Sequence, residues 1–462
     1  MAVTRRNLLK GAACFSVAPM AGLTTGCTAP LGTRQSYLTQ ILAPRNYNVI
    51  FHWLDVIMQQ VRDQRIAPPR AAYNFAMPLA AGFLAANSIT RTYAEPYNIG
   101  WGPYDADPQV AYVAAFTTAA SEVFQQPFVV ERAQFFNSIP GSQAKSRGME
   151  WGRKVGLKVV KMRTNDGSEP SEVNYYLNRY NQRHDALAWK PTGPFYSATP
   201  GPAFDSFARA AFPGHGAITP WTMKIGSQFR VPGFHHPASP EFAAEFKYIR
   251  DIGGSQSRIR TPEQSEIAMF WEDGPWGITP PGHFLYLSAQ ALQHKPLSFI
   301  ELARAFALLG MTQCDASICA WDNKYAHDII RPESSIRIRA PQFRNPDPDV
   351  RVTPNWQSYI PTPNFPAYTS GHSTFGAAAA EMLTLILGRE DVALSGKVPD
   401  EVIWPQLKGV VRHWRNIRHA AEENGVSRLY GGVHWELDHK NGMRSGGDLA
   451  NHAFHTMFPR IG

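Results

Sequence analysis

Three short clusters in the C-terminal half of the chain carry the residue types that bind and activate an oxyanion. A compact anion with several oxygens needs charged donors, a hydroxyl, and backbone N–H groups that a glycine leaves unobstructed. A histidine beside such an anion adds acid–base chemistry. The clusters are, in chain order, Lys324 with Arg331-Pro332, Ser370-Gly371-His372, and Ser427-Arg428 with His434.

The first cluster places two cations seven residues apart. On one continuous helix, Lys324 and Arg331 would leave the same face. Pro332 is expected to end that helix just after Arg331. Taken alone, the pair is also typical of a solvated basic face.

The second cluster lies between a proline-rich stretch and an alanine-rich segment. We therefore expect it at or near a helix N-terminus, where free N–H groups and the helix dipole favour an anion. Ser370 can donate its hydroxyl and Gly371 its N–H, while His372 can act as an acid or base on an apical ligand. A helix N-cap with a surface histidine would give the same pattern.

The third cluster combines a guanidinium with a histidine–carboxylate pair. Asp438 follows His434 by four positions, so the carboxylate can hold one imidazole nitrogen and leave the other unprotonated. Gly431-Gly432 should break regular structure between Arg428 and this pair. A core histidine beside a helix cap is the alternative interpretation.

The elements that must position these clusters are mostly helical. Residues 165 to about 240 are rich in proline, glycine and aromatics, which predicts a long ordered loop. Two alanine-rich segments, 71–88 and 303–320, have a similar spacing of alanines. This similarity either indicates a duplicated bundle or is due to chance. Apolar periodicity beginning at Val49 predicts helices there and near residues 108–124, 149–163, 240–252, 261–270, 285–293, 297–328 and 375–388.

The N-terminus resembles a twin-arginine export signal, with Arg5-Arg6 followed by a short apolar region. We expect residues 1–27 to be a leader, residues 28–45 a linker, and the protein to be periplasmic or otherwise extracytoplasmic. Cys27 ends a loose lipoprotein box, so a lipid anchor there and ordinary cleavage nearby both stay open. Elsewhere the sequence has no run of about 18 apolar residues, so no transmembrane segment is expected.

Charge and cysteine content exclude several classes of function. The net charge is +8, and three leader cations account for part of it, which leaves +5. Without a Lys/Arg-rich run or a nucleic-acid-binding signature, this excess predicts attraction of small anions rather than of nucleic acid. Cys314 and Cys319 would point about 140° apart on a helix, which predicts buried free thiols, and no zinc-binding spacing is present.

The three clusters together resemble the signature of the vanadium-dependent haloperoxidases and the type 2 phosphatidic-acid phosphatase superfamily. That signature reads Lys-x6-Arg-Pro, then Ser-Gly-His, then Ser-Arg-x5-His-x3-Asp, and Thr369 stands where the family usually has proline. The resemblance to the haloperoxidase branch covers roughly residues 45 to 460. Its flanking matches are Trp321 to Tyr325, Phe365 to Tyr368, Arg260 to Gln264, Phe270-Trp271 and the helix around Trp53.

The resemblance implies an all-α fold of two related four-helix bundles, with extra helices and long ordered loops. Within a domain over residues 46–462, the N-terminal bundle would span about 46–250 and the C-terminal, vanadate-binding bundle about 260–462. One vanadate per chain is implied, with His434 as the vanadium ligand, and a homodimer stays open. The residues implied to hold its other oxygens are Lys324, Arg331, Ser370, Gly371 and Arg428.

The resemblance also implies further roles. His372 would be the acid or base, Asp438 would support His434, and Lys324 would polarise the peroxide for attack by halide, which releases hypohalous acid. Release of the hypohalous acid and halogenation of a bound organic substrate both stay open. Trp321 and Phe365 would line the halide approach. Asp273 would be an indirect partner of the anion through Arg428.

Two rival functions use the same residues. In an exported acid phosphatase, His434 would attack phosphorus and His372 would protonate the leaving group. In an exported anion-binding protein, the same site would have lost catalysis. The haloperoxidase flanks and the lack of membrane helices favour the oxidase.

Overall fold

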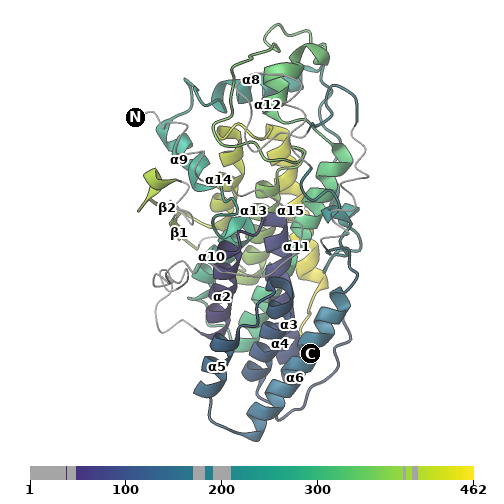
Figure 1. Ribbon diagram of the computed structural model, residues 1–462, viewed down its shortest axis with the longest axis vertical. Coiled ribbons are helices and arrows are strands. Elements are labelled where there is room, and N and C mark those ends of the chain that lie inside the picture. Colours follow the sequence, from purple (N-terminus) through teal and green to yellow (C-terminus); the bar gives the residue numbers. More distant parts are fainter. Residues whose placement is uncertain are drawn as a thin grey trace, which may run out of the picture.

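The computed structural model describes residues 38, 48–169, 183–190, 210–388, 392–397 and 404–461. The expected leader with Cys27 lies outside these residues, as does the expected linker apart from Leu38. Within the described ranges the protein is all-α, with a small two-stranded sheet, which confirms the predicted fold class (Figure 1). No helix in these ranges is both long and apolar enough to cross a bilayer.

The N-terminal helices pack through small residues. Glycines at positions 148, 152 and 156 form one stripe on α6 that faces α4, and a Cβ at Gly152 would lie 2.3 Å from the Ala111 carbonyl oxygen. The side chain of Asn48 caps the first of these helices by accepting from Ile50 and Phe51 N–H groups. The helices are α2 (Val49–Asp63), α3 (Pro68–Thr90), α4 (Pro108–Phe124), α5 (Val129–Ser138) and α6 (Gln143–Arg163).

The long helix α11 (Phe299–His327) connects the two halves of the molecule, because it packs against α3 on one side and against α13 (Gly371–Leu387) on another. It begins with a capping box in which Ser298 and Glu301 satisfy each other's backbone N–H groups. The two alanine-rich segments of the sequence fall on α3 and α11. At Gly310 a Cβ would lie 2.8 Å from Leu79, so small residues are what allow this close contact.

The C-terminal helices surround α13, which packs against α10, α14 and α15 as well as α11. In Figure 1, α8 and α12 lie at the opposite end of the molecule from α5 and α6. The antiparallel strands β1 and β2 pair Leu394 with Trp414. The remaining elements are α8 (Pro240–Ile252), α9 (Pro262–Phe270), α10 (Thr279–Leu292), α12 (Pro332–Ser334), α14 (Ile417–Tyr430), α15 (Glu436–Thr456), β1 (Leu394–Lys397), β2 (Val411–Trp414), the 3-10 turns η5 (His215–Ala217), η6 (Gly226–Phe229), η8 (Ala340–Phe343) and η9 (Pro405–Leu407), and the π-helical turn η7 (Ser335–Arg339).

Several predicted elements are confirmed, and others begin earlier than the sequence indicated. The helices over 108–124 and 240–252 match α4 and α8, whereas α13 begins at Gly371 rather than at residue 375. The described parts of the predicted loop over 165–240 contain only the short turns η5 and η6 before α8 begins. Cys314 and Cys319 are buried free thiols, as predicted.

Candidate active site

The first cluster is not carried by one helix. Helix α11 ends at His327, and Asp328 closes it in the left-handed conformation with φ of 52°. Arg331 follows in extended backbone (φ −74°, ψ 151°) and precedes the short helix α12. The expectation that Lys324 and Arg331 share a helical face is therefore wrong, and the turn at Asp328 is what redirects Arg331.

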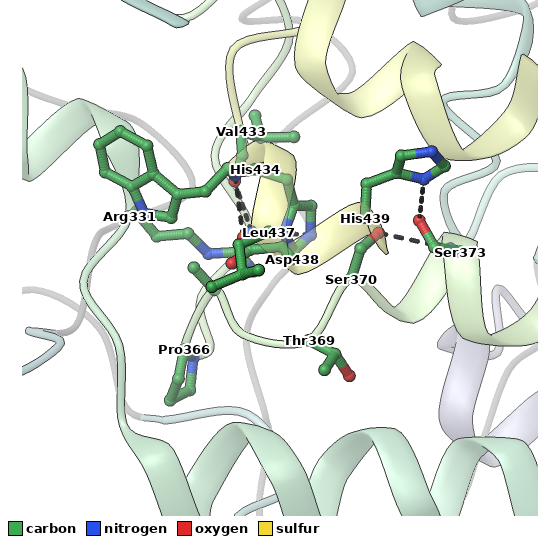
Figure 2. Close-up of polar contacts among 12 residues, drawn as sticks. Arg331, Pro366, Thr369, Ser370, Ser373, Val433, His434, Leu437, Asp438 and His439 are labelled. Atoms are coloured by element: carbon green, nitrogen blue, oxygen red, sulfur yellow. Dashed lines mark hydrogen bonds and ion pairs between the residues drawn. The ribbon is translucent and has the colours of Figure 1, made fainter. Parts of the chain in front are cut away.

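The Arg331 guanidinium is fully buried and is fixed by backbone carbonyls. Its Nε donates to the Phe365 carbonyl oxygen at 2.8 Å, and its Nη1 donates to that of Val433 at 2.7 Å. The same Nη1 lies 3.0 Å from His434 Nε2 (Figure 2). The Nη2 atom is buried and has no partner among the described residues.

The position of His434 is set by the start of α15. His434 precedes the N-cap residue Trp435, and its Nδ1 lies 2.7 Å from Asp438 Oδ2. The same oxygen accepts the Trp435 N–H at 2.9 Å, so Asp438 both caps the helix and orients the imidazole. Since the carboxylate accepts from Nδ1 and a guanidinium cannot accept, Nε2 is the unprotonated nitrogen and points toward Arg331.

Burial determines the charge state of this pair. Burial lowers the pKa of His434 well below its ordinary value, and the cations Arg331 and Lys324 act in the same direction. Burial raises the pKa of Asp438, and the Trp435 N–H and the neighbouring cations act against this rise. A neutral imidazole with its free lone pair on Nε2 is the state expected of a nucleophile or a metal ligand.

The second cluster forms the N-terminus of α13, as predicted. Ser370 is the N-cap residue, and its Oγ accepts the Ser373 N–H at 3.3 Å, so its own hydroxyl hydrogen is left to donate elsewhere. The Ser370 N–H donates to the Asp438 carbonyl oxygen at 2.9 Å, which ties this turn to α15. A Cβ at Gly371 would meet Trp321 only at 3.6 Å, so packing does not require this glycine.

Lys324 is fully buried on the last turn of α11, and its ammonium is surrounded by backbone oxygens. Its Nζ donates to the carbonyl oxygens of Pro366, Ala367 and Thr369, at 3.1, 3.0 and 2.5 Å. Burial lowers its pKa well below the ordinary value, and the charge of Arg331 adds to that effect. Because an ammonium has three donors, Lys324 must give up one of these carbonyls to bind an external anion.

Arg428 on the last turn of α14 is the third buried cation. Its Nη1 donates to the Trp271 carbonyl oxygen at 3.3 Å, and its Nε is buried with no partner in the described part of the chain. Asp273, expected near this guanidinium, pairs directly with His283, whose Nδ1 lies 3.0 Å from its Oδ2. Asp273 acts on Arg428 through its charge, which opposes the lowering of the Arg428 pKa by burial.

His372 is half-buried on the first turn of α13, and its Nε2 lies 3.3 Å from the Glu272 carbonyl oxygen. Burial lowers its pKa well below the ordinary value, with Arg428 as the next cause. Ser427, beside Arg428, donates its hydroxyl to the Asn424 carbonyl oxygen at 2.6 Å and is occupied within α14.

Trp321 and Phe365 form an aromatic wall beside the cations. Their ring centroids are 5.0 Å apart. The Lys324 Nζ lies 5.0 Å from the Phe365 centroid, and the Arg331 Cζ lies 4.9 Å from it. The structure thus brings these aromatic rings to the cationic cluster, as the sequence led us to expect.

The donor set of this cluster fits an oxyanion. Lys324, Arg331 and Arg428 are all buried; the buried carboxylate of Asp438 acts on Lys324 and Arg331, and that of Asp273 acts on Arg428. Two guanidinium nitrogens lack partners among the described residues, and a buried donor without an acceptor is costly. No group of three His, Cys, Asp or Glu residues in those ranges could hold a metal cation by itself.

Comparison with known proteins shows which sequences and folds this chain is similar to. A family model described as the VCPO second helical-bundle domain matches residues 304–461. The vanadium chloroperoxidase of Curvularia inaequalis is 27% identical over 234 residues, which are 40% of this chain and 38% of that enzyme. Residues 304–461 are therefore similar to a helical-bundle domain of the vanadium haloperoxidases, and the aligned part spans less than half the length of that curated relative.

The fold of this chain resembles that of solved structures over most of its length. A bacterial vanadium-dependent iodoperoxidase superposes with a TM-score of 0.70 at 22% identity, covering 89% of this chain and 97% of that one. A bacterial vanadium-dependent chloroperoxidase, solved in its apo form, gives a TM-score of 0.64 at 17% identity, covering 84% and 94%.

Sequence reasoning missed two residues beside the site, Glu245 and His283. Glu245 on α8 accepts the Leu437 N–H at 2.9 Å at the start of α15. His283 on α10 is the buried partner of Asp273. Both reach the site from elements distant in the sequence, and neither lies in a motif, so the sequence offered no signal for them.

Proposed function

We propose that this protein is a vanadium-dependent haloperoxidase that uses hydrogen peroxide to oxidise halide to a hypohalous acid or an equivalent halogenating species. One observation carries the proposal. Three buried cations lie around a neutral histidine whose Nε2 lone pair points toward Arg331, and two of the guanidinium nitrogens have no partner among the described residues. The vanadium ligand of such an enzyme needs that lone pair, and its oxygens need those donors.

The residues that would hold vanadate, one per chain, can be named from their donors. His434 Nε2 would be the ligand atom, once Arg331 Nη1 turns from it to an oxygen. Arg331 Nη2 and Arg428 Nε are unpartnered among the described residues, and the Ser370 hydroxyl and the Gly371 N–H lie at the N-terminus of α13. Bound vanadate would supply Lewis-acid activation of peroxide without changing its oxidation state.

The protein's own groups then have separate tasks. Asp438 keeps His434 in the Nδ1–H tautomer, so that Nε2 stays available. His372, neutral because of burial, would accept a proton from incoming peroxide at its free ring nitrogen. Lys324 would release a carbonyl and place its N–H on the reacting oxygen, while Trp321 and Phe365 limit access of water to that side.

Phosphate-ester hydrolysis is the second candidate, because the same geometry suits it. A neutral His434 could attack phosphorus through its unprotonated Nε2, once Arg331 Nη1 turns from it, and His372 could protonate the leaving group. The three cations would neutralise the phosphoryl oxygens in that reaction too. The similarity of residues 304–461 to a vanadium chloroperoxidase domain and the aromatic wall of Trp321 and Phe365 support the oxidase instead.

Two further proposals concern location and partners. The twin-arginine pattern supports export to the periplasm or another extracytoplasmic site, with a lipid anchor at Cys27 as a variant of that proposal. Halide and hydrogen peroxide are the proposed substrates, an organic molecule is the proposed halogen acceptor, and a homodimer is the proposed assembly.

The deciding experiment uses the purified protein, first vanadate-free and then reconstituted with orthovanadate. We would assay bromination of a dimedone-type acceptor with bromide and peroxide, beside hydrolysis of p-nitrophenyl phosphate by the vanadate-free form. Vanadate-dependent bromination with feeble phosphatase activity is the expected result. Brisk ester hydrolysis that vanadate inhibits, without bromination, would instead assign the phosphatase reaction.

Two variants test the assignment of the histidines. His434→Ala should abolish vanadate retention, whereas His372→Ala should retain vanadate and lose turnover. Equilibrium dialysis with orthovanadate measures the first effect and the bromination assay the second. If the His434→Ala protein binds vanadate as tightly as the wild type, the ligand assignment is wrong.

A further inference from the structure

Two successive residues of α15 hold the N-terminal turn of α13. The Asp438 carbonyl oxygen accepts the Ser370 N–H at 2.9 Å. One residue later, His439 Nδ1 lies 3.0 Å from Ser373 Oγ, and both groups are buried (Figure 2). The same stretch of α15 begins with the helix cap that orients His434. Residues 434–439 therefore fix His434 and the Ser370 turn relative to each other.

Glycines make this contact close. A Cβ at Gly442 on α15 would lie 2.8 Å from the Ser370 carbonyl oxygen and 2.9 Å from Ser373 Cβ. On α14, a Cβ at Gly425 would lie 2.3 Å from His439 Nδ1, so the imidazole occupies the space that a side chain would fill. The His439 ring is thus confined between two helices and directed at Ser373.

The hydrogen bonds around His439 have one consistent direction. Its Nε2 lies 3.0 Å from Glu422 Oε1, and a carboxylate can only accept there, so Nε2 carries the hydrogen. In the neutral imidazole, Nδ1 is then the acceptor, and the Ser373 hydroxyl donates to it. This bond to His439 is the main cause that lowers the pKa of the Glu422 carboxyl.

We infer that His439 is a positioning residue for the oxyanion site, acting through Ser373. Ser373 is the third residue of α13, and its N–H donates to the Ser370 Oγ at 3.3 Å. By holding the Ser373 side chain, His439 fixes the helical turn that presents the Ser370 hydroxyl and the Gly371 N–H to the anion. The inference rests on the oxyanion site of the proposed function, but His439 itself does not contact the anion.

A catalytic relay is the other interpretation of a serine, a histidine and a glutamate in a row. Ser373 is fully buried, and its hydroxyl donates to His439 with no room for a substrate beside it, since a Cβ at Gly425 would already lie 3.0 Å from its Oγ. A nucleophile needs access to the substrate. The row therefore serves to position α13.

The test is a double-mutant cycle on the vanadate-free full chain, with inorganic phosphate as the probe and calorimetric titration as the measurement. His439→Ala and Ser373→Ala should each weaken phosphate binding by about fivefold to tenfold, the worth of one buried hydrogen bond. The double variant should be no weaker than either single one, because both changes break the same contact. His439→Asn keeps an acceptor near the Nδ1 position and should restore most of the affinity.

The control is His455→Ala, an exposed histidine on the last turn of the same helix, which should bind phosphate as the wild type does. Wild-type affinity in His439→Ala, additive losses in the double variant, or no rescue by His439→Asn would each overturn the inference. If His439→Ala does not fold, Ser373→Ala, which removes one oxygen, carries the test. Failure of the wild type to bind either phosphate or vanadate would instead overturn the proposed function.

Discussion

Two positions on α11 handle buried charge in opposite ways. At Asp315, near the middle of the helix, both carboxylate oxygens are occupied by the segment that begins at Trp221. They accept from Trp221 N, Thr222 N, Thr222 Oγ1 and Met223 N, at 2.7, 2.6, 2.7 and 3.2 Å. Nine residues later, Lys324 lies among other cations, and two of their N–H donors have no partner in the described ranges.

The difference separates a structural cluster from a functional one. At Asp315 the anion belongs to the chain, and four donors compensate the cost of its burial, so the cluster ties the 221–223 segment to the helix. At Lys324 the donors exceed the acceptors, so burial of Arg331 and Arg428 is compensated only when an anion arrives. The first cluster should therefore set stability and the second binding.

The largest effect should follow from removing the Asp315 carboxylate. We call its cluster closed, because every buried charge in it has partners from the chain. In Asp315→Ala, the Trp221 and Thr222 N–H groups stay buried without an acceptor, so we expect a loss of about 3 to 5 kcal/mol in the free energy of unfolding. Urea denaturation measures it. Asp315→Asn, which keeps one carbonyl acceptor, should lose less, and equal losses in the two variants would contradict the account.

A smaller effect, on phosphate affinity instead of stability, is expected at the cluster of Lys324, Arg331 and Arg428. We call this cluster open, because some of its donors have no acceptor among the described residues. Arg331→Met should weaken phosphate binding by roughly 100-fold, or about 2.7 kcal/mol, because charge-assisted donors are lost. The unfolding free energy without anion should change by no more than about 1 kcal/mol, since lost hydrogen bonds to Phe365 and Val433 are offset by relief of repulsion with Lys324. Calorimetric titration and urea denaturation give the two numbers.

Arg337 provides a matched control for that variant. It is also buried, but its Nη1 is paired with Glu333 Oε1 at 3.1 Å, so its cluster is closed. Arg337→Met should destabilise the fold by leaving the buried Glu333 carboxylate with the Thr362 hydroxyl but without its cationic partner, and should leave phosphate affinity unchanged. If Arg331→Met and Arg337→Met behave alike, the distinction between open and closed clusters does not hold.

Anion binding should also stabilise the wild type. Phosphate at 100 times its dissociation constant should add about 2.7 kcal/mol to the unfolding free energy, because the ligand binds only the folded state. Thermal unfolding at rising phosphate concentration checks this. The Arg331→Met variant should show almost none of the shift at the same concentrations, and a full shift there would place the anion elsewhere.

Local patterns in the sequence predicted the parts of the site that depend on near neighbours. Ser370 does cap α13, and Asp438 does hold His434, because both relations span only a few residues. The placement of Arg331 could not be predicted in the same way. The chain leaves α11 through a left-handed Asp328, a conformation that the local sequence does not specify.

Helix α15 shows why the remaining fold escaped prediction. Its interior contains Gly442, Gly446 and Gly447, and each glycine costs about 1 kcal/mol of helix propensity relative to alanine. Packing overrides that cost: a Cβ at Gly446 would lie 2.3 Å from the Thr374 carbonyl oxygen on α13. Gly442 and Gly446 face a partner helix more than 60 residues away in the sequence, which a prediction from local periodicity does not include, whereas a Cβ at Gly447 would meet no atom within 4 Å.

The smallest effect is expected on the pH dependence of stability at Glu245. This residue is intermediate between the two kinds of cluster, because one of its carboxylate oxygens has a partner and the other has none among the described residues. Its Oε1 accepts the Leu437 N–H, while its Oε2 is buried with no partner in the described ranges. Burial, with the charge of Asp438 as the next cause, raises the pKa of Glu245 to about 8. Since a glutamate in the unfolded chain titrates near about 4.3, the protonated form stabilises the fold, and this contribution is lost as pH rises toward 8.

Glu245→Gln removes that loss because the amide stays neutral and still accepts the Leu437 N–H. Relative to the wild type, the variant should gain about 2 kcal/mol between pH 5 and pH 6.5, measured by urea denaturation at both values. Glu241→Gln, an exposed change on the same helix, should show no such gain. A constant difference between Glu245→Gln and the wild type at the two pH values would mean that Glu245 is ionised throughout, and that its carboxylate belongs to a closed cluster like that of Asp315.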